Sequence, residues 1–326
     1  MNVTRRKLLA GAAAMPLALH PLRASAQENY PKREVHVICA YAPGTGADIV
    51  VRFFAEQLRK RAGKPMIVEN KPGAGTSIAS EYVARAKPDG YTLLITPGNG
   101  LAGNPYLYKN LSHDVVNDFA PVTTLVKLPF MLAVRPDSPA RSVADFLTLM
   151  KEKGGKASYG YPNNLALAAG ELLKERTGIQ AVAVPYKSTP EALNDMTNGL
   201  IDFLWSDATF ALGQAKGGKM RLLAVTSSER SGLDPSLPTL QESGVRDFHL
   251  EAWWGAWFPA TTPRPIVDKV AGWLNEALTD PETREFLARA APSDPFPGTP
   301  ESTLAYLKQD IPRWAEVFKL AKIEPQ

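Results

Sequence analysis

The chain has 326 residues, and its 37 Lys and Arg residues exceed its 33 Asp and Glu residues by four. The first 26 residues contain three Arg, one Lys and no acid, so residues 27–326 carry no net charge. This neutrality argues against nucleic acid as a partner. A hydrophobic fraction of 44% with 21% charged residues is typical of a globular protein and excludes extensive disorder. The length predicts two domains.

Residues 1–26 have the features of a bacterial export signal. A short basic segment precedes a moderately apolar stretch, and the signal ends in the small residues Ala24-Ser25-Ala26. The paired Arg5 and Arg6 favour the twin-arginine route. We therefore expect cleavage near Ala26 and a mature protein in the periplasm. The alternative interpretation is an amphipathic N-terminal helix.

Strand and helix patterns alternate at the start of the mature chain. Strands are predicted at 34–41, 66–69 and 91–96, with helices at 47–61 and around 78–86. The second of these helices is followed by the turn Pro88-Asp89-Gly90. This βαβαβ order predicts a parallel sheet with helices on its faces.

A second set of patterns follows a stretch rich in Pro, Asn and Tyr at residues 104–121. Its expected strands are 130–134, 157–161, 181–185, 201–205 and 220–226. Three helices are expected in this set. The first begins at a capping box at Ser142, the second covers 165–173, and the third begins at Thr189-Pro190.

The third segment begins near residue 251 with an aromatic strand that holds Trp253, Trp254 and Trp257, for which we predict core packing. Helices are then expected to begin at Thr262-Pro263, Asp280-Pro281 and Thr299-Pro300.

Residues suited to catalysis are few. The single cysteine, Cys39, lies in an apolar run and is predicted to be a packed strand residue. The histidines of the mature chain are His36, His113 and His249, and none lies in a glycine-rich loop. The third glycine of a dinucleotide motif would be Ile49, and no P-loop lysine is present. We expect no catalytic residue, no metal and no cofactor.

Four strand-to-helix junctions have the composition of a binding site. In open α/β sheets, ligands bind beyond the carboxyl ends of strands, where glycines allow close approach and helix N-termini attract anions. The junctions lie at residues 41–48, 70–77, 161–164 and 187–190. Together they predict an anion site in which backbone groups, with few cationic side chains, attract the ligand.

Two acids near these junctions each have two interpretations. Asp48 falls in the first turn of its predicted helix, where the helix dipole alone explains it, but it also lies beside the first loop. Asp207 ends a predicted strand, where it either faces a cleft or is a solvated loop acid.

A series of landmarks runs through the mature chain in a fixed order. They are 41–48, Val68–Gly75, Asp89–Leu94, Val184–Lys187, Leu223–Ser227, Leu237–Leu240 with Glu242 and Gly244, and Trp254-Gly255 leading to 259–263. In this order the sequence resembles the Bug (Bordetella uptake gene) family, the extracytoplasmic solute receptors of tripartite tricarboxylate transporters.

The resemblance implies an α/β fold, a two-lobe periplasmic binding protein of type II-like form with a ligand cleft between the lobes. Lobe 1 would combine residues 27–125 with 251–326, and lobe 2 would span 126–250. The chain would be a monomer that captures a small carboxylate, which would be a di- or tricarboxylate, an amino acid or an aromatic acid. It would deliver this ligand to the membrane subunits of the transporter. The binding residues implied are Tyr41, Pro43, Gly44, Thr45, Gly46, Asp48, Gly73, Ala74, Gly75, Thr76, Tyr161, Asn163, Asn164, Ser188, Thr189 and Asp207.

The sequence departs from the family's pattern at two places. Thr45 replaces the second glycine of the usual first loop, and Leu167 stands where a histidine is common. Tyr41, Tyr161 and Trp205 would supply an aromatic wall, which leaves an aromatic or medium-chain carboxylate open. The alternatives are an exported enzyme that uses the same cleft, with Asp48 or Asp207 as acid or base, and a receptor that serves a sensor protein.

Overall fold

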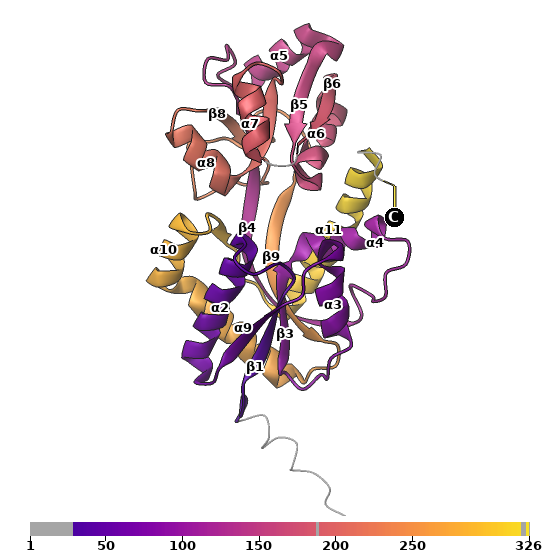
Figure 1. Cartoon of the computed structure of the whole chain (residues 1–326), viewed down its shortest axis with the longest axis vertical. Helices are drawn as coiled ribbons and strands as arrows, with labels where there is room; N and C mark the ends of the chain where they lie inside the picture. Colours follow the sequence, from indigo (N-terminus) through magenta and orange to yellow (C-terminus); the bar gives the residue numbers. More distant parts are fainter. Residues whose placement is uncertain (1–28, 187–188, 321–323, 326) are drawn as a thin grey trace, which may run out of the picture.

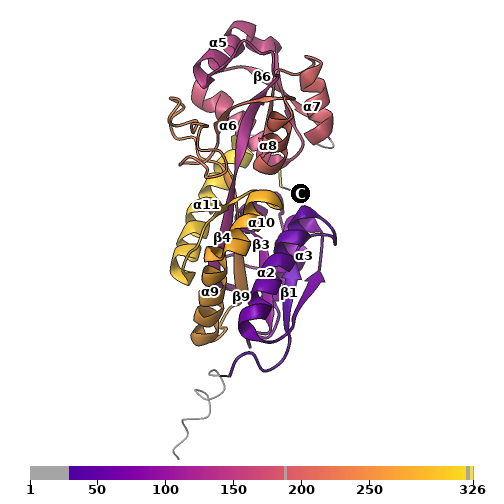
Figure 2. The ribbon, with the colours of Figure 1, turned by 90° about the vertical axis from the view of Figure 1, so that its left-hand side faces the viewer.

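The computed structural model describes residues 29–186, 189–320 and 324–325, so the predicted leader and its cleavage site lie outside the described residues. The molecule is elongated, with two lobes stacked along its long axis (Figure 1). Strands β4 and β9 run from one lobe toward the other, as the perpendicular view also shows for β4 (Figure 2). Among the described helices, none combines the length and the hydropathy that crossing a membrane requires.

Lobe 1 is built on a mixed sheet in the order β2-β1-β3-β9-β4. Its strands are β1 (Val35–Cys39), β2 (Met66–Asn70), β3 (Thr92–Pro97), β9 (Glu251–Pro259), the first part of β4 (Phe119–Val134) and β10 (Asp294–Pro295). Its helices are α2 (Gly46–Ala62), α3 (Ser77–Ala84), α4 (Gly98–Leu107), α9 (Arg264–Thr279), α10 (Pro281–Arg289) and α11 (Pro300–Leu320). The predicted parallel pairing holds for β1 with β2 and β3, but β9 is antiparallel to both β3 and β4.

Lobe 2 contains the last part of β4 and the strands and helices that lie between β4 and β9 in the chain. Its other strands are β5 (Ala157–Tyr161), β6 (Ala181–Pro185), β7 (Phe203–Asp207) and β8 (Arg221–Val225). Its helices are α5 (Val143–Lys153), α6 (Asn164–Thr177), α7 (Thr189–Thr197) and α8 (Ala208–Lys216). The predicted capping box is confirmed, because the Ser142 hydroxyl accepts the Asp145 N–H while the Asp145 carboxylate accepts the Ser142 N–H.

Strand β4 belongs to both lobes. Its residues 119–129 pair with β9, and residues 130–134 pair with β7 and β8. The register against β9 shifts at two irregularities, which break the alternation of inward and outward side chains that the sequence would otherwise display. The predicted lobe limits near residues 125 and 250 stay predictions. Strand β4 passes through the first limit, and β9 begins at the second.

Three parts of the fold differ from the sequence-based expectations. Helices α4 and α8 were not predicted, and β4 begins at Phe119, inside the stretch rich in Pro, Asn and Tyr at 104–121 for which no strand was predicted. Helix α4 contains Pro105, and its buried residues do not form one apolar face. They include glycines and an asparagine and lie on several sides of the helix. Helical propensity and periodicity therefore give no signal there.

The aromatic strand β9 is core, as predicted. Trp253 and Trp257 are both fully buried, and the Trp253 indole N–H donates to the Asp310 carboxylate of α11 at 2.8 Å. Cys39 is also fully buried on β1, and burial raises the pKa of its thiol, which confirms a packed strand residue.

Two helical glycines make a matched test of packing in lobe 2. A Cβ on Gly170 of α6 would lie 2.1 Å from Cζ of the buried Tyr159, whereas a Cβ on Gly213 of α8 would meet no atom within 4 Å. Helix propensity alone would make both alanine substitutions stabilising by about 0.5–1 kcal/mol. We expect that gain for Gly213→Ala, but a loss of about 1–3 kcal/mol for Gly170→Ala, because the ring must move. Urea unfolding measures both, and equal effects would contradict this packing.

Candidate functional site

A cavity of about 780 Å³ lies between the lobes. Lobe 1 supplies the loop after β1, the loop after β2, the start of α4 and two aromatic side chains of α11, and lobe 2 supplies the start of α6. Ala252 of β9 and Phe130 of β4 lie on the strands that join the lobes. This volume is within the range of about 300–1,000 Å³ found for small-molecule sites.

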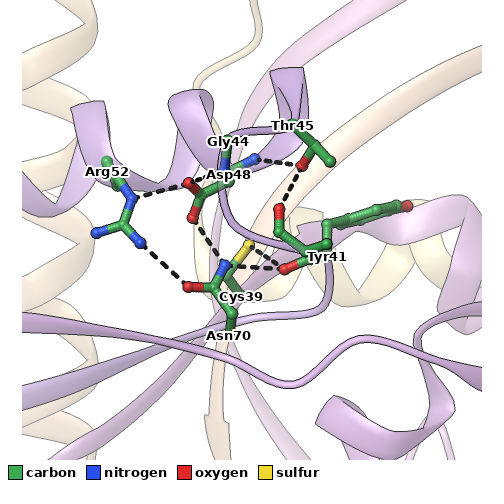
Figure 3. Close-up of polar contacts among 8 residues, drawn as sticks. Cys39, Tyr41, Gly44, Thr45, Asp48, Arg52 and Asn70 are labelled. Carbon is green, nitrogen blue, oxygen red and sulfur yellow. Dashed lines mark hydrogen bonds and ion pairs between the residues drawn. The ribbon is translucent and has the colours of Figure 1, made fainter.

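The first loop is held by the carboxylate of Asp48, which is only 2% exposed. Its Oδ2 accepts the Gly44 N–H at 2.9 Å and the Arg52 Nε–H at 2.8 Å, and its Oδ1 accepts the Asn70 amide at 2.7 Å (Figure 3). Burial alone would raise the pKa of Asp48, but these hydrogen bonds outweigh it and lower the pKa to about 2. Asp48 is therefore ionised at neutral pH and fully engaged inside the protein.

Asn70 and Thr45 complete the support of the same loop. The Asn70 amide also donates to the Tyr41 carbonyl at 2.8 Å, which ties the end of β2 to the loop after β1 (Figure 3). The Thr45 hydroxyl donates to the Ala42 carbonyl and accepts the Asp48 N–H as the N-cap of α2. Thr45 is thus a cap that fixes the start of α2.

The second loop has an unusual backbone. Gly73, Ala74, Gly75 and Thr76 all have positive φ angles of 126°, 45°, 54° and 83°. Such angles cost energy at non-glycine residues and persist only where the surroundings hold them. Here Asn104 of α4, 1% exposed, donates from its amide to the Gly75 carbonyl and to the Ser77 hydroxyl, both at 2.9 Å.

Two helices begin at this cavity without a side-chain cap. Neither Thr76, which precedes α3, nor Pro97, which precedes α4, makes a capping hydrogen bond. The first N–H groups of a helix have no partner within the helix, and they carry the positive end of its dipole. Thr76, Pro97, Asn99 and Gly100 all line the cavity, so both helix starts face it.

The structure brings together six of the residues predicted from the sequence. The six that line the cavity are Tyr41, Thr45, Gly73, Gly75, Thr76 and Asn163. Seven others lie in the same junctions but not on the cavity wall: Pro43, Gly44, Gly46, Asp48, Ala74, Tyr161 and Thr189. Asp207, at the end of β7, is also absent from the cavity wall. The side chain of Asn164 and the whole of Ser188 lie outside the described part of the chain.

The predicted residues of lobe 2 act mainly as helix caps. Asn163 Oδ1 accepts the Ala166 N–H at 2.9 Å, and Asp207 Oδ1 accepts the Phe210 N–H at 3.0 Å. The expectation that Trp205 forms part of an aromatic wall is wrong, because Trp205 is fully buried in the core and stacks on Phe248.

Two groups of cavity residues were missed by sequence reasoning. Helix α4 contributes Pro97, Asn99, Gly100, Asn104 and Leu107, and helix α11 contributes Trp314 and Phe318. The first group follows the carboxyl end of β3 and so obeys the rule that selected the other loops. The second group has no such signal, since α11 lies about 200 residues from the loops that it faces.

The described histidines lie outside the cavity. Among the described residues, no cluster of three His, Cys, Asp or Glu side chains is arranged to hold a metal ion. His36 contacts Glu69, His249 contacts Glu251 at 2.7 Å, and burial lowers the pKa of His113. None of these histidines lines the cavity.

A family model described as "Tripartite tricarboxylate transporter family receptor" matches residues 50–322. An Agrobacterium vitis protein encoded in the TAR-I ttuE-ttuC' intergenic region is 32% identical over 314 residues, which cover 95% of this chain and 90% of the relative.

Two solved structures share the fold over nearly their whole length. The periplasmic binding protein BugD is 34% identical, with a TM-score of 0.71 over 91% of this chain and 100% of that one. The R. palustris protein Rpa4515, solved with adipate, is 28% identical, with a TM-score of 0.75 over 91% and 100%.

The Asp48 network predicts a pH-dependent contribution to stability. Because the folded state lowers the pKa of Asp48 from 3.8 to about 2, its carboxylate should stabilise the fold by about 2 kcal/mol at neutral pH. The contribution is complete above about pH 5 and is lost as the pH falls from about 4 to about 2. Asp48→Asn should therefore lower the free energy of unfolding by this amount at pH 7 and by less at pH 3.

Urea unfolding of both proteins across this pH range measures the difference. Asp137→Asn is the matched control, because the Asp137 side chain is 76% exposed and should contribute little at any pH. A deficit in Asp48→Asn that does not change between pH 3 and pH 7 would show that its cause is steric, not electrostatic.

Proposed function

The chain belongs to the tripartite tricarboxylate transporter receptor family of periplasmic solute-binding proteins, and we propose that it captures one small carboxylate between its lobes. The resemblance to the Bug family is thereby confirmed. In the proposal, the receptor delivers its ligand to the membrane subunits of a tripartite transporter and acts as a monomer. A twin-arginine leader cleaved near Ala26 would place it in the periplasm.

The observation that carries the carboxylate proposal is the pair of uncapped helix N-termini. Helices α3 and α4 begin beside the cavity with backbone N–H groups that no side chain accepts, and the 73–76 loop adds glycine backbone that a ligand can approach closely. A hydrogen bond to a charged group is worth about 1.5–3 kcal/mol net. Several such bonds support micromolar binding of a carboxylate after association costs.

Binding is favoured over catalysis by the side chains in the cavity. The described residues that line it include Thr45, Thr76, Asn99, Asn104 and Asn163, which donate and accept hydrogen bonds but do not titrate near neutral pH. Asp48 and Asp207, the acid–base candidates of the enzyme alternative, are engaged in the first loop and at the start of α8. These positions support a receptor.

The proposed capture motion is a closure of the lobes. Strands β4 and β9 are the connections whose bending would move the lobes that we place at 27–125 with 251–326 and at 126–250. A ligand that contacts both lobes stabilises the closed state in proportion to its preference for that state. Helix N-termini of both lobes would then approach the ligand.

A thermal-shift screen of the mature protein tests the proposed function. A carboxylate at 100 times its Kd should add about 2.7 kcal/mol to the free energy of unfolding and raise the midpoint by several degrees. Citrate, dicarboxylates, aromatic acids, amino acids and fatty acids cover the class, and their amides are matched neutral controls. Stabilisation by neutral compounds alone would refute the carboxylate proposal, and turnover of a bound compound would favour an enzyme.

Asn104 gives a second test, because it holds the 73–77 backbone from beneath. Asn104→Ala should weaken carboxylate binding by about tenfold or more, since an unsupported loop with four positive φ angles must be ordered by the ligand. Asn275→Ala is the matched control: its amide also donates from a helix to a loop carbonyl, that of Gly298, but far from the cavity. Both variants should lose stability, and only the first should lose affinity in calorimetric titration. Equal affinities would remove this loop from the site.

A further inference from the structure

The cavity has two chemically different ends, and helix α4 connects them. Gly100, Asn104 and Leu107 all line the cavity at i, i+4 and i+7 spacing, so they lie on one face of α4. Leu107 lies seven residues after Gly100, which corresponds to about 10 Å along the helix. Along this face the cavity is lined first by the backbone of Gly100, then by the amide of Asn104, and last by the aliphatic side chain of Leu107.

The apolar end is completed by helix α11, which lies beside α4 (Figure 1). Gly103 of α4 leaves room for this contact, because a Cβ there would lie 3.2 Å from the Phe318 ring. The indole N–H of Trp314 donates to the Asp310 carboxylate at 3.1 Å, so its hydrogen-bonding group is already used within α11. Trp314 and Phe318 therefore offer carbon surface to the cavity.

No charged side chain is found among the described residues that line this cavity. One carboxylate can be satisfied at the polar end by the N-termini of α3 and α4. A second carboxylate, several ångströms along the ligand toward α11, would meet Leu107, Phe130 or the α11 aromatics, where it would lose water without gaining donors. On the lobe 2 side, the neutral amide of Asn163 is the described side chain of the lining that can donate.

The starts of α6 and α8 in lobe 2 do not offer an equivalent second anion site. The first turn of α6 is capped by Asn163, and the first turn of α8 is capped by Asp207, which is itself an anion. At the described helix starts that line the cavity, a side-chain cap is thus present at α6 and absent at α3 and α4, although the Ala74 carbonyl accepts the Ser77 N–H at the start of α3. Residues 187 and 188, which precede α7, lie outside the described part of the chain.

From these contacts we infer that the ligand is a monocarboxylate with an apolar body, and that Leu107, Trp314 and Phe318 set this specificity. The carboxylate binds at the starts of α3 and α4, and the body lies along α4 toward α11. This inference rests on the proposed function and narrows its ligand class, because adipate, the ligand named for Rpa4515, carries a second carboxylate.

The test compares ligands that differ only by the second carboxylate. Isothermal titration of the mature protein is carried out with hexanoate against adipate and with benzoate against terephthalate. We expect the monocarboxylate of at least one pair to bind, and to bind at least about tenfold more tightly than its dicarboxylate partner. Hexanamide, the neutral control, should bind more weakly than hexanoate.

The outcomes separate the two proposals. A dicarboxylate that binds as tightly as its partner, or tighter, overturns the inference and leaves the carboxylate receptor intact. Failure of all four acids, when the wider screen finds another carboxylate, also overturns it. Failure of every carboxylate refutes the proposed function itself.

A charge placed at the apolar end should reverse the preference. Leu107 is only partly buried, so Leu107→Lys can place an ammonium group at the end of α4 where the body of the ligand would lie. We expect this variant to bind adipate at least about tenfold more tightly, relative to hexanoate, than the parent does. Leu147→Lys, the same change at a partly buried position of α5 outside the cavity, should keep the parent preference. If the folded Leu107→Lys protein keeps the parent's ratio of adipate to hexanoate affinity, the ligand body does not lie along α4.

Discussion

Strand β4 is the constraint on which the rest of the structure depends. It pairs with β9 over its first part and with β7 and β8 over its last part, so a single strand is a member of both sheets. Backbone hydrogen bonds in a sheet are obligatory once they are buried, because an unpaired group would lose its solvation. The two lobes are therefore held in line, and the strand-to-helix junctions of both sheets lie toward the same space.

The cavity that results is lined, among the described residues, by uncharged groups. Helix starts and the neutral side chains of Thr76, Asn99 and Asn104 form its polar end, and the charged Asp48 nearby shapes the first loop. Asp48 shows this division most clearly: with Gly44, Arg52 and Asn70 it forms a closed network beneath the first loop, and it presents no free oxygen to the cavity wall. Fixed dipoles of this kind need no rearrangement when a ligand arrives, which favours binding.

Sequence reasoning was successful where one local rule decided the outcome. The strand of Cys39, the capping box at Ser142 and the core tryptophans follow from composition and spacing alone. It failed where neighbours override propensity. Helix α4 persists with Pro105 inside it because α11, α3 and β9 pack around it, and Trp205 lies in the core because Phe248 covers it.

The sequence by itself determined the family, the two-lobe α/β fold and most of the glycine-rich junctions, because a strand that ends in Gly, Ser or Asn before a helix exposes its backbone in any context. It could not determine which of these residues face the cavity. That depended on the Asp48 network, on the support that Asn104 gives the second loop, and on α11 returning from the end of the chain to lay Trp314 and Phe318 against α4. These contacts join residues far apart in the chain, and only the folded backbone fixes the distances and directions between them.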